Sequence, residues 1–246
     1  MKKLLTMTAA AALLAGSAFA QDTVRIGSEG AYPPYNFIND AGELAGFERE
    51  LGDEICRRAE LTCTWVLNDW DSIIPNLTGG NYDVIMAGMN INEERKQVIS
   101  FTQAYTPALP SAYAALSADA NVGDGAVVSA QTNTIQAAYV ADSEATLLEY
   151  ALPDETVAAV RNGEADAVFA DKDFLVGAVE ESGGQLVWVD GFDTVALGEG
   201  IGAGIRQSDT ELLAKFDDAL SAMKEDGSLN ELLVKWFGDE VEQFQN

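Results

Sequence analysis

Histidine is absent from all 246 residues, and lysine and arginine together number only 14. Without an imidazole the chain cannot form a serine–histidine–acid triad, use histidine for acid–base catalysis or build the usual histidine-containing zinc sites. The GxSxG motif of α/β-hydrolases, the GxxxxGK[ST] motif of P-loop proteins and a free CxxC pair are also missing. These absences exclude the most familiar hydrolase, nucleotide-binding and zinc-enzyme classes.

Positive charge is scarce, since 40 acidic residues face 14 basic ones and the net charge is −26. Lys2 and Lys3 lie in a predicted export signal, and their removal leaves 12 basic against 40 acidic residues, a net charge of −28. So negative a surface repels nucleic acid and anionic membranes, and neither is an expected partner. We attribute the acidity to solubility rather than to recognition of a ligand.

The first twenty residues, MKKLLTMTAAAALLAGSAFA, combine two lysines, an apolar run without acids and a closing Ala-Phe-Ala. This pattern predicts a secretory signal, residues 1–20, that is cleaved before Gln21. Ser17 stands where a lipoprotein signal would need cysteine, so the mature protein is expected to be free and soluble. A retained anchor is the alternative, but the apolar run is shorter than the roughly 20 residues that span a bilayer.

The only two cysteines, Cys56 and Cys63, are seven positions apart. The first lies late in a helical pattern, and the second begins the strand-like stretch CTWVL. In an exported protein such a pair is expected to form a disulfide, which by loop-closure entropy would contribute about 2 to 3 kcal/mol. Two reduced, buried thiols are the alternative.

Apolar alternation predicts strands, and helical periodicity predicts helices between them. The predicted strands are 23–27, 63–67, 82–88, 125–130, 165–171 and 186–190. The predicted helices are 46–60, 71–78, 93–99, 134–140, 155–162, 172–182 and 208–226, with a short last helix to Phe237. Alternating strands and helices indicate an α/β fold whose sheets are mixed but mainly parallel.

Two segments of the chain repeat one pattern, GGNYDVIMAG around Asp83 and NGEADAVFAD around Asp166. The echo favours two sheets of like construction over one large sheet, with chance similarity as the alternative. The proline-containing stretch YTPALPSAYAAL would lead the chain out of the first unit, and LGEGIGAGIR, 197–206, would bring it back. The predicted lobes are therefore 21–108 together with 197–246, and 109–196 between them.

Two glycine- and acid-containing loops do not predict cofactors. The run GEGIGAG, 198–204, fits a nucleotide-binding glycine pattern only nominally, because a strand-like Ile-Arg and a turn follow it instead of a helix. The loop DANVGDG, 119–125, lacks the glycine and glutamate that a calcium loop needs at its sixth and twelfth positions. We expect neither a metal nor a cofactor.

The stretch AGMNINEER, 87–95, places Arg95 where a small ligand could bind. It follows the carboxyl end of a predicted strand, where ligand crevices of α/β folds lie. Asn92 can cap a helix whose first turn holds Glu93 and Glu94. The Arg95 guanidinium suits two parallel hydrogen bonds to a carboxylate, but an ion pair with Glu93 or Glu94 at the surface explains it equally well.

The order of several motifs resembles the periplasmic polar amino-acid binding proteins of ABC importers, family 3 of the solute-binding proteins. These motifs are GxxGAYPPYNF, GFERELGDEICRRAELTCTW, DWDSIIPNLTGGNYDVIMAGMNINEER, a QxxT loop, ADAVFAD and a last helix ending KWFG. The likeness covers nearly all of 22–240 and is nearest to the lysine/arginine/ornithine and histidine binders, including their cysteine pair. It implies two α/β lobes, joined by two hinge strands, that close on one amino acid.

The resemblance implies a role for individual residues. Arg95 matches the arginine that binds the ligand α-carboxylate, with Thr134 and Asn90 at positions that assist it. Asp171 matches the acid that binds the α-ammonium, although it could also cap the helix that follows. Tyr32 and Trp70 match an aromatic pair that encloses the ligand side chain, and packing in the core is the alternative for both.

The side-chain end of the expected pocket is less certain than the end that binds the α-groups. Glu29 and Glu48 match acidic positions there and favour a cationic side chain, yet glutamine binders also keep both acids, and Glu48 could favour its helix start. Ala87 and Gly88 replace the paired serines of the basic-amino-acid binders, and Asn133 replaces a glycine. The identity of the preferred side chain therefore stays open.

The resemblance implies a monomeric periplasmic protein that captures a polar L-amino acid and delivers it to a membrane-embedded ABC permease. Arginine, lysine, ornithine or a related opine is the expected ligand, and another polar amino acid such as glutamine or histidine is the alternative. A cyclohexadienyl dehydratase on the same fold is the enzymatic rival, with Glu29 or Glu48 as its general acid. A sensor that docks on a membrane receptor is a further alternative.

Overall fold

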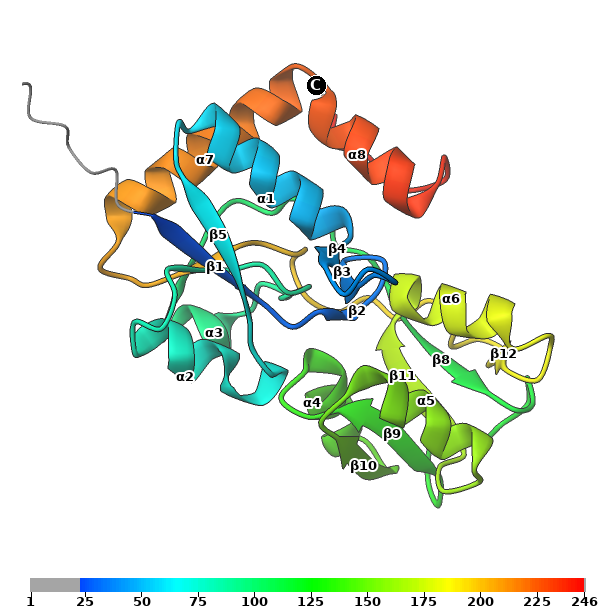
Figure 1. Cartoon of the computed structure of the whole chain (residues 1–246). Helices are drawn as coiled ribbons and strands as arrows, with labels where there is room; N and C mark the ends of the chain where they lie inside the picture. Colours follow the sequence, from blue (N-terminus) through cyan, green and yellow to red (C-terminus); the bar gives the residue numbers. More distant parts are fainter. Residues whose placement is uncertain (1–22, 246) are drawn as a thin grey trace, which may run out of the picture.

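The computed structural model describes residues 23–245 and shows two lobes side by side (Figure 1). The predicted signal segment 1–20 and its cleavage site before Gln21 lie outside the described residues. Each lobe is built on one five-stranded sheet flanked by helices, and a small three-stranded sheet lies where the lobes meet. The two-sheet α/β architecture predicted from the sequence echo is confirmed.

The first lobe has the strand order β5-β1-β6-β13-β7. These strands are β1 (Val24–Ser28), β5 (Cys63–Leu67), β6 (Val84–Ile85), β7 (Ser100–Phe101) and β13 (Gly204–Ile205). Helices α1 (Phe47–Arg58), α7 (Thr210–Glu225) and α8 (Ser228–Phe237) cover one face, and η1 (Trp70–Ser72), α2 (Ile73–Thr78) and α3 (Glu93–Lys96) lie on the other (Figure 1). The small sheet contains β2 (Ala31–Tyr32), β3 (Asn36–Ile38) and β4 (Leu44–Ala45).

The second lobe has the strand order β10-β9-β11-β8-β12. Its strands are β8 (Ser111–Ala115), β9 (Val127–Gln131), β10 (Thr146–Tyr150), β11 (Ala167–Asp171) and β12 (Val187–Trp188). Its helices are α4 (Ile135–Ala141), α5 (Pro153–Arg161) and α6 (Lys172–Glu181). All strands between 109 and 196 belong to this sheet, which agrees with the proposed division of the chain, while the boundaries themselves stay predictions.

Both sheets are mixed, and parallel pairings make up half of each sheet rather than most of it. In the first, β1 runs parallel to β5 and β6, whereas β13 is antiparallel to β6 and β7. In the second, β9 runs parallel to β10 and β11, whereas β8 is antiparallel to β11 and β12. The antiparallel strands β8 and β13 are those by which the chain enters each lobe from the other, so no crossover helix sets their direction.

Two strands that the pattern analysis did not predict complete the second sheet. Strand β8 reads SAYAA, and it is buried along its whole length, so it lacks the alternation that marks a half-exposed strand. Strand β10 reads TLLEY at the edge of the sheet, where its residues are only partly buried. Helix α3 is shorter than the predicted 93–99, because after Lys96 the chain turns through Val98 and Ile99.

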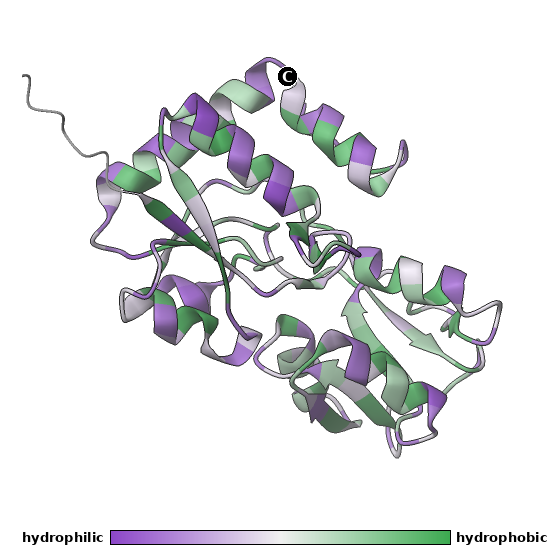
Figure 2. Ribbon diagram, in the orientation of Figure 1, coloured by the Kyte–Doolittle hydropathy of each residue, from purple (hydrophilic) through white to green (hydrophobic). Residues whose placement is uncertain are grey.

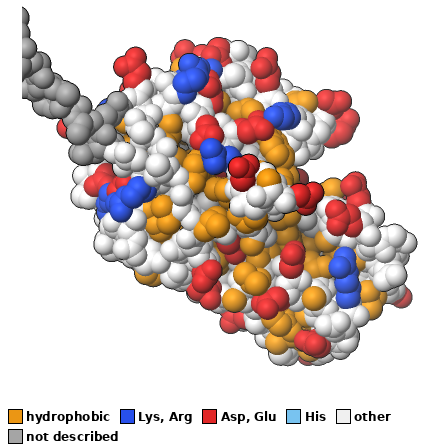
Figure 3. Space-filling view, viewed as in Figure 1, with side chains coloured by type: hydrophobic (Ala, Val, Ile, Leu, Met, Phe, Trp, Pro, Cys, Tyr) orange, Lys and Arg blue, Asp and Glu red, His pale blue; other side chains and the backbone are white. Residues whose placement is uncertain are grey.

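Apolar side chains fill the space between sheets and helices in each lobe, and the helices carry polar residues on their outer faces (Figure 2). On the face of the molecule that Figure 3 shows, acidic side chains are scattered and basic ones are fewer. The predicted disulfide is present: Cys56 at the end of α1 is bonded to Cys63 at the start of β5. Among residues 23–245, none of the helices has the length and apolar character that a membrane crossing requires.

Candidate functional site

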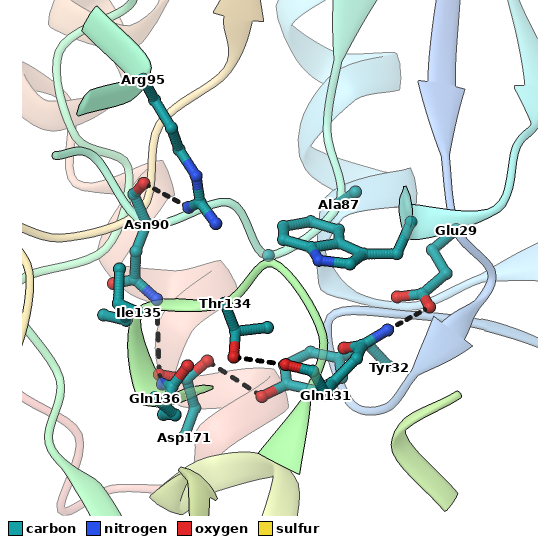
Figure 4. A pocket seen from close by; sticks show the side chains of 12 residues that line it. Glu29, Tyr32, Ala87, Asn90, Arg95, Gln131, Thr134, Ile135, Gln136 and Asp171 are labelled. Atoms are coloured by element: carbon teal, nitrogen blue, oxygen red, sulfur yellow. Dashed lines mark hydrogen bonds between the residues drawn. The ribbon is translucent and has the colours of Figure 1, made fainter. Parts of the chain in front are cut away.

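A pocket lies between the two lobes, at the carboxyl ends of strands from both sheets (Figure 4). The space between its walls, open solvent at its mouth included, is about 290 Å³. Its lining residues are Glu29, Tyr32, Trp70, Ala87, Gly88, Asn90, Arg95, Gln131, Thr134, Ile135, Gln136 and Asp171. Nine of the ten predicted ligand-binding residues are therefore brought together, all except Glu48.

Arg95 reaches the pocket from the short helix α3, whose start is capped as the sequence predicted. The Asn92 side chain accepts a hydrogen bond from the Arg95 backbone nitrogen at 2.8 Å. The guanidinium Nη1 donates to the Asn90 carbonyl at 2.7 Å, and Nη2 donates across the cleft to the Asn133 carbonyl at 3.0 Å. The guanidinium also lies 5.2 Å from the centre of the Trp70 ring, so its position is fixed before any ligand arrives.

The Arg95 guanidinium has no acidic partner among the described residues, although it is only 8% exposed. Glu93, one of the two partners that the sequence left open, pairs instead with Lys96 at 2.8 Å, and Lys96 also pairs with Glu199. Burial lowers the pKa of Arg95 to about 10, and the negative charges of Asp171 and Glu94 offset this effect only in part. Arg95 is thus a buried cation that forms no ion pair with an acidic side chain of residues 23–245.

Asp171 is a buried anion in the pocket, as Arg95 is a buried cation. It ends strand β11 and is 6% exposed. Within the part of the chain that the structure describes, its carboxylate accepts hydrogen bonds only from neutral groups, namely Tyr32 Oη at 2.9 Å, Gln136 Nε2 at 2.8 Å and Asn90 Nδ2 at 3.4 Å. Burial raises the pKa of Asp171 to about 6, and the hydrogen bonds lower it only in part. The side chain makes no capping bond to helix α6, so the alternative role of Asp171 as a cap is not seen.

The two predicted aromatic residues line the pocket, but they are engaged differently. The Trp70 ring lies under the Arg95 guanidinium, and its Nε1 donates across the cleft to the Thr132 carbonyl at 3.0 Å. The Tyr32 ring stacks on Phe174 of the other lobe, with ring centres 4.5 Å apart and planes 6° apart. One face of Tyr32 is therefore covered by protein, so a ligand can contact only its edge or its other face.

Glu29 lies on the opposite side of the pocket from Arg95 and Asp171 (Figure 4). It follows strand β1 and accepts a hydrogen bond from Gln131 Nε2 of the other lobe at 2.7 Å. Burial raises the pKa of Glu29 to about 7. Among the described residues no cluster of three or more histidine, cysteine or acidic side chains could hold a metal.

Contrary to the expectation from resemblance, Glu48 does not line the pocket. It lies in the first turn of α1, is fully buried, and accepts bonds from the Gly88 backbone nitrogen at 2.8 Å, from Asn36 Nδ2 at 2.8 Å and from the Tyr105 hydroxyl. Burial raises its pKa. The bond to Gly88 shows what this acid does, since it fixes the loop that forms the pocket wall from behind.

The remaining predicted residues shape the wall. Gly88 has a φ of +63°, a conformation that favours glycine, and a Cβ there would lie 3.2 Å from the Tyr32 ring. Ala87 precedes it with a small side chain. Thr134 caps helix α4, since its Oγ1 accepts from the Ala137 nitrogen at 3.1 Å and donates to the Gln131 carbonyl at 2.7 Å. This hydroxyl is already engaged before a ligand binds.

Three lining residues, Gln131, Ile135 and Gln136, were not predicted. Gln136 Nε2 donates to Asp171 Oδ1 at 2.8 Å and to Ser111 Oγ at 2.9 Å, so it holds the acid in place. Gln131 ends strand β9 and directly precedes the loop to Thr134. Its position at the end of a strand, next to a predicted binding residue, is the signal that could have identified it.

Comparison with known proteins places this site in a family. Residues 24–239 match the family described as bacterial extracellular solute-binding proteins, family 3. The chain is 32% identical over 255 residues to the L-arginine-binding protein of Pseudomonas aeruginosa, covering 98% of each protein. It is 31% identical to the octopine-binding periplasmic protein of Rhizobium meliloti, covering 96% of this chain and 97% of that protein.

A solved structure shows the same architecture. It is a periplasmic His/Glu/Gln/Arg/opine family-binding protein from Silicibacter pomeroyi in complex with lysine, and it is 62% identical to this chain. The superposition covers 90% of this chain and 100% of the other, with a TM-score of 0.87. The two-lobed arrangement is therefore shared along nearly the whole described chain.

Proposed function

This chain belongs to the bacterial extracellular solute-binding proteins of family 3, and from that premise we propose that it binds a polar L-amino acid with a cationic side chain between its lobes. Arginine, lysine, ornithine and related opines form the proposed ligand class. The protein would capture its ligand in the periplasm, deliver it to the membrane-embedded permease of an ABC transporter and act as a monomer.

One observation carries the proposal: the pocket contains a buried cation and a buried anion, and neither forms an ion pair with another side chain of residues 23–245. Arg95 donates only to backbone carbonyls, and Asp171 accepts only from neutral groups. A free amino acid carries the complementary pair, a carboxylate for Arg95 and an ammonium for Asp171. Such a zwitterion would offset the desolvation cost of both side chains at once.

The opposite side of the pocket supports a cationic side chain. Glu29 faces the pocket there, and Asp69 and Asp71 add negative potential around it. A ligand with a guanidinium or ammonium at its far end would place positive charge against Glu29. The names of the relatives, an L-arginine binder and an octopine binder, and the lysine in the related structure point to the same class.

Closure of the lobes would couple to binding because both lobes contribute to each end of the pocket. Arg95 belongs to the first lobe and hydrogen-bonds Asn133 of the second, and Asp171 belongs to the second and accepts from Tyr32 of the first. A ligand that joins Arg95 to Asp171 favours the closed form over the open one, and that difference in affinity shifts the equilibrium. Loss of water on closing strengthens each ion pair.

An enzymatic function on the same fold is the second candidate, because Glu29 has the raised pKa that a general acid in a cleft needs. The test is incubation with arogenate or prephenate, followed by product detection. Product formation that is lost in Glu29→Gln would establish a dehydratase. Absence of product, together with tight binding of an amino acid, would leave transport as the function.

A thermal-shift screen of about twenty amino acids and several opines tests the proposal directly. A ligand present at 100 times its dissociation constant should add about 2.7 kcal/mol to the free energy of unfolding. We expect the largest shifts for arginine, lysine, ornithine or an opine. Shifts only for neutral side chains would refute the cationic preference, and no shift at all would refute amino-acid binding.

A further inference from the structure

Gln131 has an amide whose orientation is fixed by its surroundings. It is the last residue of β9 in the second lobe and is 7% exposed. Its Nε2 donates to Glu29 Oε1 of the first lobe at 2.7 Å and to the Ala151 carbonyl at 3.0 Å. A backbone carbonyl and a carboxylate both act as acceptors, so both require the nitrogen and exclude the flipped amide.

This orientation determines what the amide offers to a ligand. An amide has two N–H donors on nitrogen and an acceptor on oxygen. Both donors of Gln131 are used, and no hydrogen bond to its Oε1 occurs within residues 23–245. Because Gln131 lines the pocket, the free acceptor lies beside Glu29, and this side of the pocket presents acceptors rather than donors.

The hydrogen bond from Gln131 also acts on the charge of Glu29. Burial raises the pKa of Glu29, and the carboxylates of Asp71, Asp69 and Glu48 raise it further. The bond from Gln131 lowers it. Without that bond, Glu29 would keep its proton to a higher pH and would attract a cation less strongly near neutrality.

We propose that Gln131 is a positioning residue for side-chain recognition: it holds Glu29 across the cleft as an acceptor and sets its own Oε1 beside it, which selects a ligand side chain carrying positive charge and at least two N–H donors. A guanidinium and a terminal ammonium satisfy both conditions, whereas a urea group of the same shape carries no charge. The inference rests on the proposed amino-acid binding.

The bond joins the lobes, so selection occurs at closure. Glu29 lies in the first lobe and Gln131 in the second, and the bond between them requires the closed form. A cationic side chain between Glu29 and the Gln131 oxygen adds to the contacts that hold the lobes together. A neutral side chain leaves the cost of dehydrating Glu29 uncompensated.

The test compares arginine with citrulline in wild type and in Gln131→Met. The two ligands share their α-groups, so the ratio of their dissociation constants cancels contributions from Arg95 and Asp171. Isothermal titration calorimetry from pH 5.5 to 8.5 measures both. In wild type the preference for arginine should rise with pH through about 7, the pKa of Glu29, and level off about one pH unit higher, where ligand-free Glu29 is almost fully ionised.

In Gln131→Met the preference for arginine at pH 7 should fall roughly 10- to 100-fold, the factor expected for a hydrogen bond to a charged group. The pH at which the preference levels off should also move upward, which a purely structural defect would not produce. Glu29→Gln should make the preference independent of pH between 6 and 8. In that background Gln131→Met should change the preference little, because the two residues act as one unit.

Tyr35→Phe is the matched control. It removes another bond between the lobes, from Tyr35 Oη to Asp173 Oδ2 at 3.2 Å, without a contact to Glu29. It should weaken arginine and citrulline equally and leave their ratio unchanged. An unchanged ratio and pH profile in Gln131→Met, or full additivity with Glu29→Gln, would overturn the inference, with Gln131→Leu replacing a methionine variant that does not fold.

The result that would refute the proposed function differs from the result that would refute only the role of Gln131. Wild-type protein that bound neither arginine nor any other amino acid would refute amino-acid binding itself, and the inference with it. Wild-type protein that binds arginine, with a selectivity that Gln131 does not influence, would refute only the inference.

Discussion

Replacement of Arg95 by methionine tests the central feature of the pocket, a buried guanidinium that is available to bind an anionic group of a ligand. Methionine has an unbranched side chain that follows a course similar to that of arginine but carries no charge. Burial lowers the pKa of Arg95 from its ordinary value to about 10, and at about 1.36 kcal/mol per pKa unit this corresponds to about 3 kcal/mol of unfavourable desolvation. A ligand carboxylate that removes most of this cost should therefore contribute about 3 kcal/mol to binding, which is roughly a 150-fold change in affinity.

We expect Arg95→Met to weaken every amino acid by about that factor, because each ligand presents the same carboxylate. Without ligand, the loss of two bonds to the Asn90 and Asn133 carbonyls, about 1.5 to 3 kcal/mol each, is partly offset by the relieved desolvation. The ligand-free protein should thus lose at most about 3 kcal/mol in urea unfolding. Arg57→Met, at a guanidinium that is 68% exposed and pairs with Glu54, should leave affinity unchanged.

Calorimetry with arginine and with a neutral amino acid measures the effect, and urea unfolding separates it from a loss of folding. An affinity within twofold of wild type for both ligands would refute the assignment of Arg95 to the carboxylate. A loss for arginine alone would also refute it, since the proposed contact does not depend on the side chain.

The folded state disfavours the charged form of Asp171, whose pKa is raised to about 6, so the stability of the ligand-free protein should increase as pH falls from 7 to 5, while its affinity for amino acids decreases. Urea titrations should show a smaller change of stability with pH in Asp171→Asn. An identical change in the variant would contradict the attribution of the trend to Asp171. Glu48→Gln brings an N–H group against a donor, either Asn36 Nδ2 or the Gly88 nitrogen depending on the amide orientation. It should cost about 1 to 3 kcal/mol of unfolding free energy and weaken cationic and neutral ligands alike; selective loss of cationic ligands would instead place Glu48 in recognition. Replacement of Cys56 and Cys63 by serine should lower stability by about 2 to 3 kcal/mol from loop entropy, measured by thermal unfolding, with little change in affinity.

The secondary structure could be predicted where local chemistry dominates. Asn92 before Glu93 predicted the helix start that carries Arg95, and the spacing of the two cysteines in an exported chain predicted their bond. Strands such as β11, with buried alanine, valine and phenylalanine, were recognised from composition. The alanine-rich β8 and the edge strand β10 were missed, because their identity depends on neighbouring strands and not on their own pattern.

The features of the candidate site also fall into those that the sequence predicted and those that only the structure showed. The sequence by itself placed Arg95 at the start of a predicted helix that follows a strand, and Asp171 at the end of another predicted strand, because the capping, turn and alternation signals that position them are local. Tertiary packing decided whether Arg95 and Asp171 form ion pairs with other side chains. Only the folded chain shows that Arg95 forms no ion pair within residues 23–245, that Glu48 lies behind Gly88, and that Gln131 meets Glu29 from 102 positions away. Burial and partner choice depend on residues far apart in the sequence, so tertiary structure alone could decide them.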